Sequence, residues 1–431
     1  MIQIAAALIF ALLALGLPVG IALILLGLGL DQLFTPIPLS KALGELSWVS
    51  SSNSLLVSVP LFILLGEILL RSGIADRLYG SMSQWLSWLP GGLMHANIGA
   101  SMGFAATSGS SVATAATISV VAAPLVDRYK YNERLFFGSV AAGGTLGILI
   151  PPSINLIIYG WLTETSVPQL YLAGFLPGLM LGALFSLAIV LVCLARPEFG
   201  GVRLKATWRE RMTGLSGLLP PFLIFVVVVG SIYAGIATPT ESASLGVVIA
   251  LGLAAAHRRL TPAMMLQVLD GTMRATGMIM LIVIGAWFLN FVLSALGFIS
   301  ALNNIIAGMG LGPTGLLVAL IVFYVILGCF MDPLAMMIVT VPITGPMVVN
   351  AGFDPVWFGI LIVLLCETAL ITPPIGMNLF VVQSVRKSGP FRDVVMGSLP
   401  FVVLMFLIIV ALIVFPDLAL WLPSAFAASR A

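Results

Sequence analysis

The stretch Gly143–Asn155, GGTLGILIPPSIN, has a close echo at Cys366–Asn378, CETALITPPIGMN. Each stretch places a Pro-Pro pair inside an otherwise apolar segment. Two adjacent prolines remove two backbone donors and disfavour helix in the residue that precedes them. Each motif therefore predicts a break in a helix. Such a break is tolerated at membrane depth only where it packs against protein or lines a polar cavity.

The offset of 222 residues between the two Pro-Pro pairs also relates other prolines. Pro124, Pro151, Pro152 and Pro168 each have a counterpart at this offset, at Pro346, Pro373, Pro374 and Pro390. A prolyl kink without function would explain one motif, but it does not explain the duplication. Paired broken helices in two halves of a chain are typical of the binding sites of secondary transporters.

The composition is that of a membrane protein. Hydrophobic residues make up 60% of the 431 residues and charged residues 8%, against roughly 25% charged in soluble domains. Apolar runs of membrane-spanning length recur along the chain, which predicts a polytopic, all-α protein of about ten spans. The cysteines, Cys193, Cys329 and Cys366, lie in apolar stretches and form neither a CxxC motif nor a disulfide framework.

The sequence lacks the motifs of metalloenzymes, ATP-driven pumps and nucleic-acid-binding proteins. The only histidines are His95 and His257, so no histidine-rich metal site is expected, and no P-loop for ATP is present. We find no nucleophile paired with a base, so an enzyme is not expected. The net charge of +2 gives no indication of nucleic-acid binding.

The order of elements follows from the apolar segments and their interruptions. The stretches 91–126, interrupted at Thr107–Ser111, and 314–349, interrupted at Met331–Pro333, are predicted to be re-entrant hairpins; a single bent span is the alternative for the first. We expect spans at about 2–30, 54–71, 170–195, 216–237, 242–256, 276–296 and 396–415, broken spans at 135–164 and 356–385, and interfacial helices at 39–52, 75–89, 261–275 and about 297–311.

Basic residues predict the orientation of the two halves. The loop 127–134, DRYKYNER, carries three basic residues, whereas its counterpart 349–356 carries none; after the broken spans the signs reverse, with none in 166–170 and three in 384–392. Basic loops face the cytoplasm. The pattern predicts an inverted-topology repeat, with the N-terminus cytoplasmic and the C-terminus periplasmic.

Small polar residues gather at all four interruptions. Helix N-termini there would favour an anion, and hydroxyl and carbonyl oxygens suit a hard cation such as Na⁺. Any single Ser or Thr could equally serve helix packing. The cation candidates are Ser108, Ser110, Ser111, Gly143, Gly144, Thr145, Asp332, Thr368 and Thr372.

Four carboxylates lie in apolar stretches, where charges are costly and are usually functional or paired. Glu67 stands one turn before Arg71, which indicates a structural ion pair, and Glu241 lies between two spans and is predicted to be interfacial. Asp332 and Glu367, at a hairpin tip and before a helix break, are the stronger site candidates. No Lys or Arg lies in the middle of a span, so an anionic substrate would depend on helix ends, hydroxyls and co-bound cations.

With these motifs in hand, the chain resembles the large membrane subunit of tripartite ATP-independent periplasmic (TRAP) transporters, the DctM or SiaM type. The resemblance covers nearly the whole chain in family order. It is carried by Ser58–Gly66, Ser108–Ala116, Gly143–Ser153, Thr238–Ala243, Met331–Pro342 and Glu367–Asn378.

The resemblance implies an elevator-type, Na⁺-coupled importer that works with a small four-span membrane subunit and a periplasmic substrate-binding protein in the bacterial inner membrane. Its substrate would be an organic acid such as a C4-dicarboxylate or a sialic acid. Carried over to this sequence, the family sites add Pro151 to the cation candidates, and for substrate they give Ser108, Gly109, Ser153, Asn155, Pro374 and Asn378.

The same resemblance implies a division into a fixed scaffold and a moving transport domain. The scaffold parts would be 1–90 and 170–311, both with arm helices, and the last span in 386–431; the transport parts would be 91–169 and 312–385. The alternatives are a self-sufficient dicarboxylate or citrate permease of the same superfamily, and a membrane-embedded enzyme or assembly scaffold. A scaffold protein would have no use for duplicated helix breaks.

Overall fold

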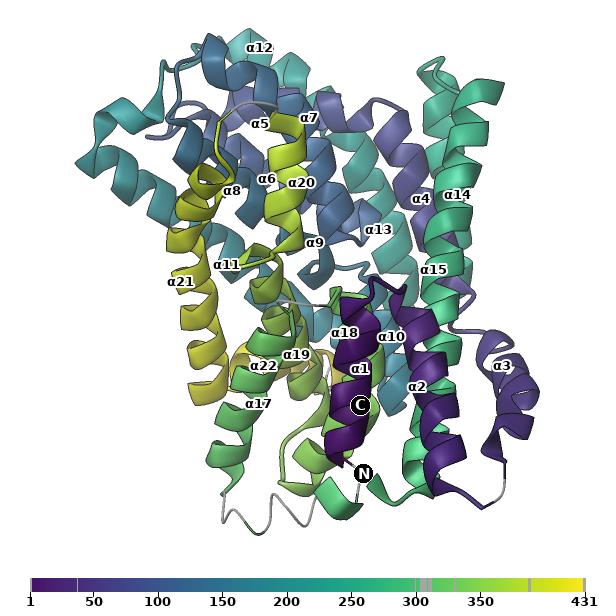
Figure 1. The fold of residues 1–431 in the computed structure, drawn as a ribbon. Coiled ribbons are helices and arrows are strands. Elements are labelled where there is room, and N and C mark those ends of the chain that lie inside the picture. The colour runs from purple at the N-terminus through teal and green to yellow at the C-terminus, as the bar shows by residue number, and fades with distance from the viewer. Residues whose placement is uncertain are drawn as a thin grey trace.

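The computed structural model describes residues 2–36, 38–298, 300–302, 308, 312–328, 331–386 and 389–428. All regular structure in these residues is helical (Figure 1), as the composition predicts. Five of the described helices are long and apolar enough to cross a membrane, or up to eight spans result if each bent helix pair is counted as one. Cys329, Lys387 and most of the expected helix at 297–311 lie outside the described residues.

The prediction of one span over residues 2–30 is wrong, because two helices occupy this stretch. Helix α1 (Ile2–Ala14) and helix α2 (Val19–Phe34) lie side by side in opposite directions (Figure 1). Gly16 adopts φ +73°, a left-handed conformation that favours glycine, and Pro18 stands directly before the first turn of α2. The local chemistry of Gly16–Pro18 therefore reverses the chain.

The first half continues as predicted into peripheral and bent helices. A 3-10 turn, η1 (Leu39–Ala42), and α3 (Leu43–Ser51) lie at the edge of the molecule (Figure 1). Helix α4 (Ser58–Arg71) then meets α5 (Ile74–Leu86) at a bend of 67°. Gly73 makes this bend with φ +75°.

Both interrupted stretches form helical hairpins. In the first, α6 (Leu93–Ser108) packs against α7 (Ser111–Arg128); in the second, α17 (Pro313–Gly328) packs against α18 (Pro333–Asn350). Figure 1 shows the first pair in the half of the molecule that holds α5 and α12, and α17 in the opposite half. The alternative of a single bent span over 91–126 is thereby excluded.

Both Pro-Pro motifs break a helix, as the sequence predicts. The first separates α8 (Glu133–Gly144) and the short α9 (Leu146–Leu149) from α10 (Ile154–Thr163) with a bend of 41°. The second separates α19 (Pro355–Ile371) from α20 (Met377–Arg386). Both Pro-Pro bonds are cis.

The prediction of an interfacial helix at 261–275 followed by a separate span is also wrong. A single helix, α15 (Pro262–Ala295), covers both. In the first half the corresponding helices α3 and α4 are separated around Ser52–Asn53, but Arg274-Ala275 stands at the same offset. Both residues favour helix, and Arg274 forms an i,i+4 ion pair with Asp270 at 2.9 Å.

The remaining helices link and flank the two halves. After α21 the chain forms α22, a helix that was not predicted and that packs against α11. The bounds are α11 (Val167–Ala195), η2 (Pro197–Gly200), α12 (Trp208–Gly214), η3 (Leu215–Gly217), α13 (Leu219–Tyr233), α14 (Pro239–Ala256), α21 (Phe391–Val414) and α22 (Asp417–Ala428).

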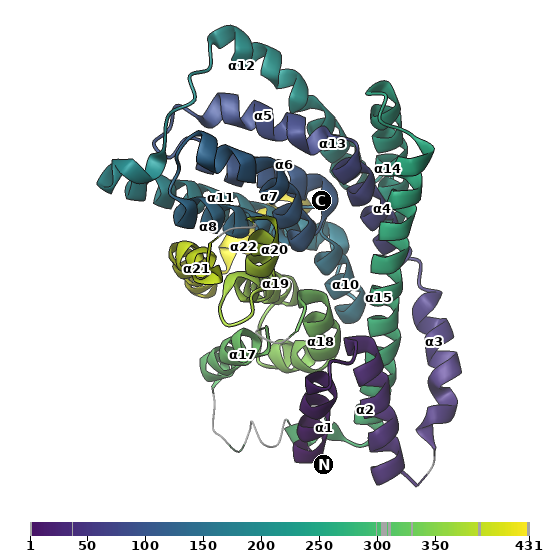
Figure 2. The ribbon, with the colours of Figure 1, turned by 45° about the horizontal axis from the view of Figure 1, so that its top comes forward.

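Close helix–helix contacts occur at two places far apart in the molecule (Figure 2). On one side α2 packs on α15, where a Cβ on Gly20 would lie 2.7 Å from Leu281; on the other, α21 packs on α8, where a Cβ on Gly138 would lie 2.1 Å from the Gly397 carbonyl oxygen. Between these places, α4 packs against α6 of the first hairpin and α15 packs against α18 of the second. The candidate site lies there.

Candidate functional site

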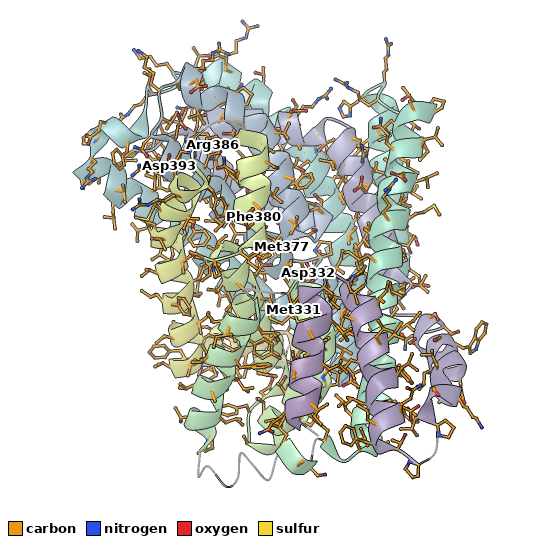
Figure 3. The ribbon with its side chains drawn as sticks, in the orientation of Figure 1. Met331, Asp332, Met377, Phe380, Arg386 and Asp393 are labelled. Carbon is orange, nitrogen blue, oxygen red and sulfur yellow. The ribbon has the colours of Figure 1, made fainter. Side chains whose placement is uncertain are left out.

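A cavity of about 230 Å³ joins the two halves of the chain. Its wall includes the first hairpin tip, the start of α10, the start of α18, and one face each of α4 and α15. The predicted site residues that line it are Ser108, Gly109, Ser110, Ser111, Asn155 and Asp332. Figure 3 places Asp332 near the middle of the molecule, with Met377 just above it. Predicted site residues as far apart in sequence as Ser108 and Asp332 therefore meet at one cavity, as the duplicated breaks predict.

The first hairpin tip is held by its own polar groups. Gly109 turns the chain with φ +61°, and Ser110 caps α7 by accepting a hydrogen bond from the Ala113 amide at 3.4 Å. The Ser108 hydroxyl lies 3.1 Å from that of Thr114. A Cβ on Gly109 would lie 2.8 Å from the Pro152 carbonyl oxygen, so only glycine lets this tip approach the first helix break so closely.

The second hairpin tip presents a carboxylate. Asp332 caps α18, and its Oδ2 accepts hydrogen bonds from the amides of Leu334 at 3.1 Å and Ala335 at 3.3 Å. Pro333 follows as the first helical residue, a position at which proline costs no hydrogen bond. The positive end of the helix dipole stabilises the negative charge of Asp332 at this position.

A hydrogen bond crosses from one half to the other beside the cavity. The Ser111 hydroxyl, at the start of α7, donates to Oε1 of Glu367 on α19 at 2.6 Å. Glu367 is completely buried. The site prediction for Ser111 and Glu367 thus acquires a specific geometry that the sequence did not indicate.

The two helix breaks also contact one another behind the cavity. Asn378 Nδ2, at the start of α20, donates to the Ala141 carbonyl oxygen on α8 at 3.3 Å. A Cβ on Gly144 would lie 3.0 Å from the same Nδ2. Gly143 similarly leaves room for Ser101, whose Oγ a Cβ there would meet at 2.6 Å. The paired glycines allow α6, α8 and α20 to pack closely at this level.

Several predicted site residues lie near the cavity but do not line it. Ser153 caps α10 by accepting from the Leu156 amide at 3.3 Å. Three threonine hydroxyls donate hydrogen bonds to carbonyl oxygens one turn earlier: Thr145 to Ala142 at 2.6 Å, Thr368 to Leu364 at 2.7 Å and Thr372 to Thr368 at 2.6 Å. The lone pairs of these hydroxyl oxygens remain available as acceptors. The candidates outside the cavity wall are Gly143, Gly144, Thr145, Pro151, Ser153, Thr368, Thr372, Pro374 and Asn378.

Glu67 reaches the cavity, which sequence reasoning missed. Its predicted ion pair is confirmed, since Arg71 Nε lies 3.1 Å from Glu67 Oε2. The same side chain lines the cavity from α4 and rests against α15, where a Cβ on Gly271 would lie 2.6 Å from Oε2. The i,i+4 spacing predicts the ion pair between Glu67 and Arg71. No signal in the sequence indicates that this face of α4 points into the cavity.

Glu241, the remaining carboxylate of the apolar stretches, has a local structural role. Its Oε2 accepts hydrogen bonds from the Thr238 amide and hydroxyl, both at 2.8 Å, and the Thr238 hydroxyl accepts from the Glu241 amide at 3.3 Å. This reciprocal arrangement is a capping box at the start of α14. Glu241 is exposed and far from the cavity wall, in agreement with its predicted interfacial position.

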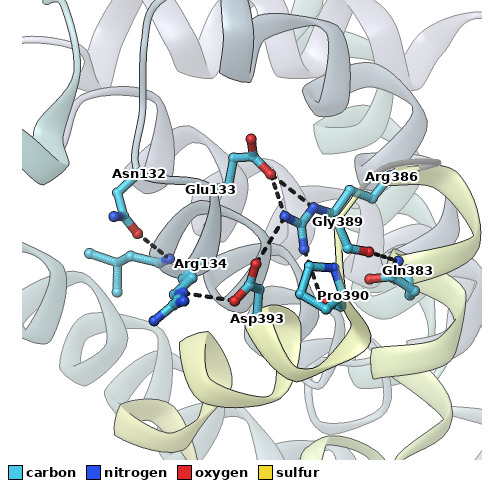
Figure 4. A network of polar contacts seen from close by, with 9 residues as sticks. Asn132, Glu133, Arg134, Gln383, Arg386, Gly389, Pro390 and Asp393 are labelled. Carbon is cyan, nitrogen blue, oxygen red and sulfur yellow. Dashed lines mark hydrogen bonds and ion pairs between the residues drawn. The ribbon is translucent and has the colours of Figure 1, made fainter.

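Towards the end of the molecule that holds α12, a charge network joins the two halves (Figures 3 and 4). The buried guanidinium of Arg386 contacts Glu133 Oε2, with Nε at 3.0 Å, and Asp393 Oδ2 at 3.4 Å. Arg134 completes the network, with its Nε 2.8 Å from Asp393 Oδ1. The start of α8 is therefore bound to the end of α20 and the start of α21.

Comparison with known proteins agrees with this architecture. The family model of the tripartite ATP-independent periplasmic transporter, DctM component, matches residues 6–418. The chain belongs to this family. It is therefore a permease subunit of a periplasmic transporter system and a multi-pass membrane protein, not an enzyme.

Individual members of the TRAP family are similar over most of their length. The C4-dicarboxylate TRAP transporter large permease protein DctM of Pseudomonas aeruginosa is 35% identical over 87% of each chain. The sialic acid permease SiaM of Vibrio cholerae is 31% identical over 95% of this chain and 96% of its own. The ectoine permease TeaC of Halomonas elongata is 31% identical over 85% and 86%.

A solved structure supports the fold of this TRAP permease. The crystal structure of the Alcanivorax borkumensis YdaH transporter matches it with a TM-score of 0.59, at 14% sequence identity, over 94% of this chain and 97% of that chain. The match at so low an identity concerns the fold alone. It agrees with an all-helical transporter that contains several bent helix pairs.

Proposed function

We propose that this chain is the translocating subunit of a Na⁺-coupled, binding-protein-dependent importer of an organic acid. One observation carries the proposal: the starts of α7, α10 and α18 all meet the 230 Å³ cavity. Helix N-termini favour negatively charged groups. Of the described residues, no Lys or Arg lines the cavity. A substrate carboxylate would therefore bind to helix ends and hydroxyls.

A bound cation fits the same surroundings. Asp332 supplies a carboxylate, and the hairpin tip and helix breaks supply hydroxyl and carbonyl oxygens, which are the ligands that hard cations take. The proposed Na⁺ ligands come from Ser108, Ser110, Ser111, Asp332 and the supporting layer of threonines and glycines behind them. Cation binding would offset the charge of Asp332 and attract an anionic substrate.

An elevator mechanism is proposed from the family and from the duplicated hairpins and broken helices. Residues 91–169 and 312–385 would move against a scaffold of 1–90 and 170–311, with the cavity at the boundary between them. We place α21 with the moving part, because its Gly397 packs against α8 at Gly138 and Arg134, and because the Arg386 network binds its first turn. This differs from the sequence-based division, which left 386–431 in the scaffold.

A second, larger cavity lies at the proposed boundary between the moving part and the scaffold. A cavity of about 800 Å³ lies between α10, α15 and α18, in the half of the molecule away from α12. At its edge Trp161 of α10 stacks on Trp287 of α15, with ring centroids 5.0 Å apart. The pair would separate when the moving part shifts along α15. The cavity would form the route between the site and the periplasm.

The orientation follows from the basic loops. The loops 127–134, 196–214 and 257–259 lie at the end of the molecule that holds α12 (Figure 1), and Arg386 lies towards the same end (Figure 3). We assign this end to the cytoplasm. Helix α1 begins at the opposite end (Figure 1), because the turn at Gly16 reverses the chain. The N-terminus would then be periplasmic rather than cytoplasmic, and α21 would end on the periplasmic side.

The partners proposed from the family are a small four-span membrane subunit and a periplasmic substrate-binding protein. Relatives carry names that specify C4-dicarboxylates, sialic acid and ectoine. All of these compounds bear a carboxylate. The substrate class is therefore proposed as a carboxylate-bearing organic solute, selected mainly by the binding protein.

Uptake in proteoliposomes tests this function. The chain is reconstituted with its small subunit, and labelled C4-dicarboxylate, sialic acid or ectoine is supplied with the binding protein, with and without an inward Na⁺ gradient. We expect uptake that needs both the gradient and the binding protein. Uptake without the binding protein would indicate a self-sufficient permease, and uptake without a Na⁺ gradient would contradict Na⁺ coupling.

Site variants complete the test. Asp332→Ala and Ser110→Ala should abolish or strongly reduce uptake while both proteins remain expressed and monodisperse. Glu198→Gln, on the exposed loop after α11, serves as the matched control and should transport normally. Normal uptake by both site variants would refute the assignment of the cavity.

A further inference from the structure

The segment between α11 and α13 carries basic side chains that the proposed transport function does not use. Five of the 18 Lys and Arg residues of the chain lie between positions 196 and 214: Arg196, Arg203, Lys205, Arg209 and Arg211. One of the two acidic residues there, Glu210, belongs to the capping box of α12, where its Oε2 accepts from the Thr207 amide at 2.7 Å. None of the ion pairs among the described residues includes a residue of this segment. Its positive charge is therefore not paired with carboxylates of the described chain.

Helix α12 is held against α5 through its backbone carbonyl oxygens. The Trp85 indole Nε1 donates to the Arg211 carbonyl oxygen at 3.0 Å, and the Ser81 hydroxyl donates to the Gly214 carbonyl oxygen at 2.6 Å. Figure 2 shows α12 at the outer edge of the molecule, beyond α5. The other side of α12 is consequently left on the outside.

The outward side of this segment is apolar as well as basic. Trp208 is 66% exposed, and Met212, one turn later, is 49% exposed. The apolar surface continues into the first turn of α13, where Leu219 and Phe222 are each 63% exposed. Exposed aromatic and aliphatic side chains beside Lys and Arg are typical of helices that lie in the membrane interface.

The path of the chain places this segment where an apolar helix leaves the membrane. The helical run Trp208–Gly217 meets α13 (Leu219–Tyr233) at a bend of 42°, so that α12 turns aside from the direction of the apolar helix. The segment lies at the end of the molecule that we assign to the cytoplasm (Figure 1). The cytoplasmic leaflet carries anionic lipids, which attract basic residues close to the end of a membrane-spanning helix.

We propose that α12 and the loop before it form a binding surface for anionic phospholipids of the cytoplasmic leaflet. The exposed side chains of Arg203, Lys205 and Arg209 supply the positive charge for the phosphate groups. Trp208 and Met212 contact the acyl chains beside them. A phospholipid fits both parts of this surface, because its phosphate complements the charge while its acyl chains cover the apolar side chains.

The lipid would act on the scaffold through α5. Trp85 and Ser81 join α12 to α5, and α5 packs against α6 of the first hairpin. An anchored α12 would therefore hold the layer of the scaffold against which the hairpin moves. The inference uses the cytoplasmic assignment of this end, and it is independent of the substrate and of Na⁺ coupling.

The surface is tested by quenching of Trp208 fluorescence in nanodiscs that hold the full chain. Each disc contains phosphatidylcholine with a fixed minor fraction of phosphatidylglycerol. In one series the phosphatidylglycerol is brominated, and in the other an equal amount of the phosphatidylcholine is brominated. The signal of Trp208 is the difference between each protein and its Trp208→Phe form. We expect brominated phosphatidylglycerol to quench Trp208 about threefold more strongly, because the basic side chains concentrate the anionic lipid.

Two charge variants show whether these residues cause the difference. The patch variant combines Arg203→Gln, Lys205→Gln and Arg209→Gln, and the ratio of the two quenching values should fall to about one. The loop control should keep the wild-type ratio. It removes the same charge from exposed residues of other loops at the same end of the molecule, through Lys130→Gln, Arg258→Gln and Arg259→Gln.

Several results would overturn the proposal. Equal quenching by both lipids in wild type would show a lipid contact that does not recognise charge, and a wild-type ratio in the patch variant would exclude these residues. An equal fall in the loop control would show a response to net charge alone. Loss of Trp208 quenching when the small membrane subunit is bound would assign the surface to that subunit. If the patch variant does not fold, Arg209→Gln alone should lower the ratio, and an unchanged ratio contradicts the proposal.

Discussion

The close crossing of α8 and α21 allows a quantitative test of the proposed rigid body. A Cβ on Gly397 would lie 1.8 Å from the Arg134 carbonyl oxygen, whereas ordinary contacts begin at 3.4 Å. The shortfall of 1.6 Å cannot be absorbed by a flexible side chain, because the opposing atom belongs to the backbone of α8. Gly397→Ala must therefore push the two helices apart.

The cost should lie at the upper end of what overpacking produces, about 3 kcal/mol. For a chain of this length, that corresponds to a fall in Tm of roughly 4 °C. The assay is thermal unfolding of purified protein in one detergent. Gly252→Ala is the matched control, because Gly252 lies inside α14 and a Cβ there meets nothing within 4 Å. The control should lose nothing, since alanine favours helix over glycine by about 0.5–1 kcal/mol.

An uptake measurement distinguishes a variant that is only less stable from one in which α21 no longer moves together with α8. If α21 travels with α8, Gly397→Ala should reduce uptake per folded molecule, because a widened α8–α21 interface also shifts the first helix break. A Tm equal to that of Gly252→Ala would refute the packing argument. A lower Tm with normal uptake would refute the placement of α21 in the moving part.

Three further substitutions have expected results of different kinds. Arg386→Gln removes the cation shared by Glu133 and Asp393; because Glu133 is half-exposed and Asp393 keeps Arg134, the unfolding free energy should fall by only about 2 kcal/mol, measured as a fall in Tm. Tyr324→Phe removes a hydroxyl that lies 2.6 Å from the Thr340 hydroxyl and 2.9 Å from that of Thr344. It should cost only about 1 kcal/mol in the same assay, because both threonines keep their helix carbonyl partners. Glu67→Gln removes a negative charge from the cavity wall and should lower the KM for an anionic substrate about threefold in the uptake assay.

The sequence predicted the helix breaks well because proline and glycine act through their own backbone. Pro151-Pro152 and Pro373-Pro374 interrupt helices wherever they occur, and Gly109 turns a hairpin by local geometry. Gly16 and Pro18 carry the same kind of signal, and they reverse the chain between α1 and α2, where the apolar run alone predicts one continuous span. The local backbone preferences of proline and glycine are therefore sufficient to predict these breaks and turns.

Continuity and side-chain direction depend on more than local signals. The 222-residue offset predicts a helix break before residue 276, because the first half has a break at Ser52-Asn53. At the same offset, however, the second half has Arg274-Ala275, and both of these residues favour helix. The two halves therefore share the path of the chain, but they do not share every helix break. Likewise, the composition of α4 gives its apolar character, but only the packing of α15 determines that Glu67 faces the cavity.

The 222-residue offset also explains how charge is distributed in the site. Ser110 and Asp332 occupy equivalent positions, and each caps the second helix of its hairpin. Asn155 and Met377 are equivalent too, and both line the cavity. The symmetric positions therefore share a structural role while their chemistry differs.

This asymmetry favours different ligands on the two sides. Thr145 bonds within its own helix, whereas its counterpart Glu367 reaches across to the first hairpin. Apart from Glu67, which is paired with Arg71, the carboxylates at the proposed site, Asp332 and Glu367, come from the second half, and the uncharged caps and Asn155 come from the first. Cations are favoured beside carboxylates, and anions are favoured beside helix N-termini whose caps carry no charge. Within the proposed mechanism, Na⁺ would therefore bind nearer the second half and the substrate carboxylate nearer the starts of α7 and α10, so that the ion and the substrate attract one another across the cavity.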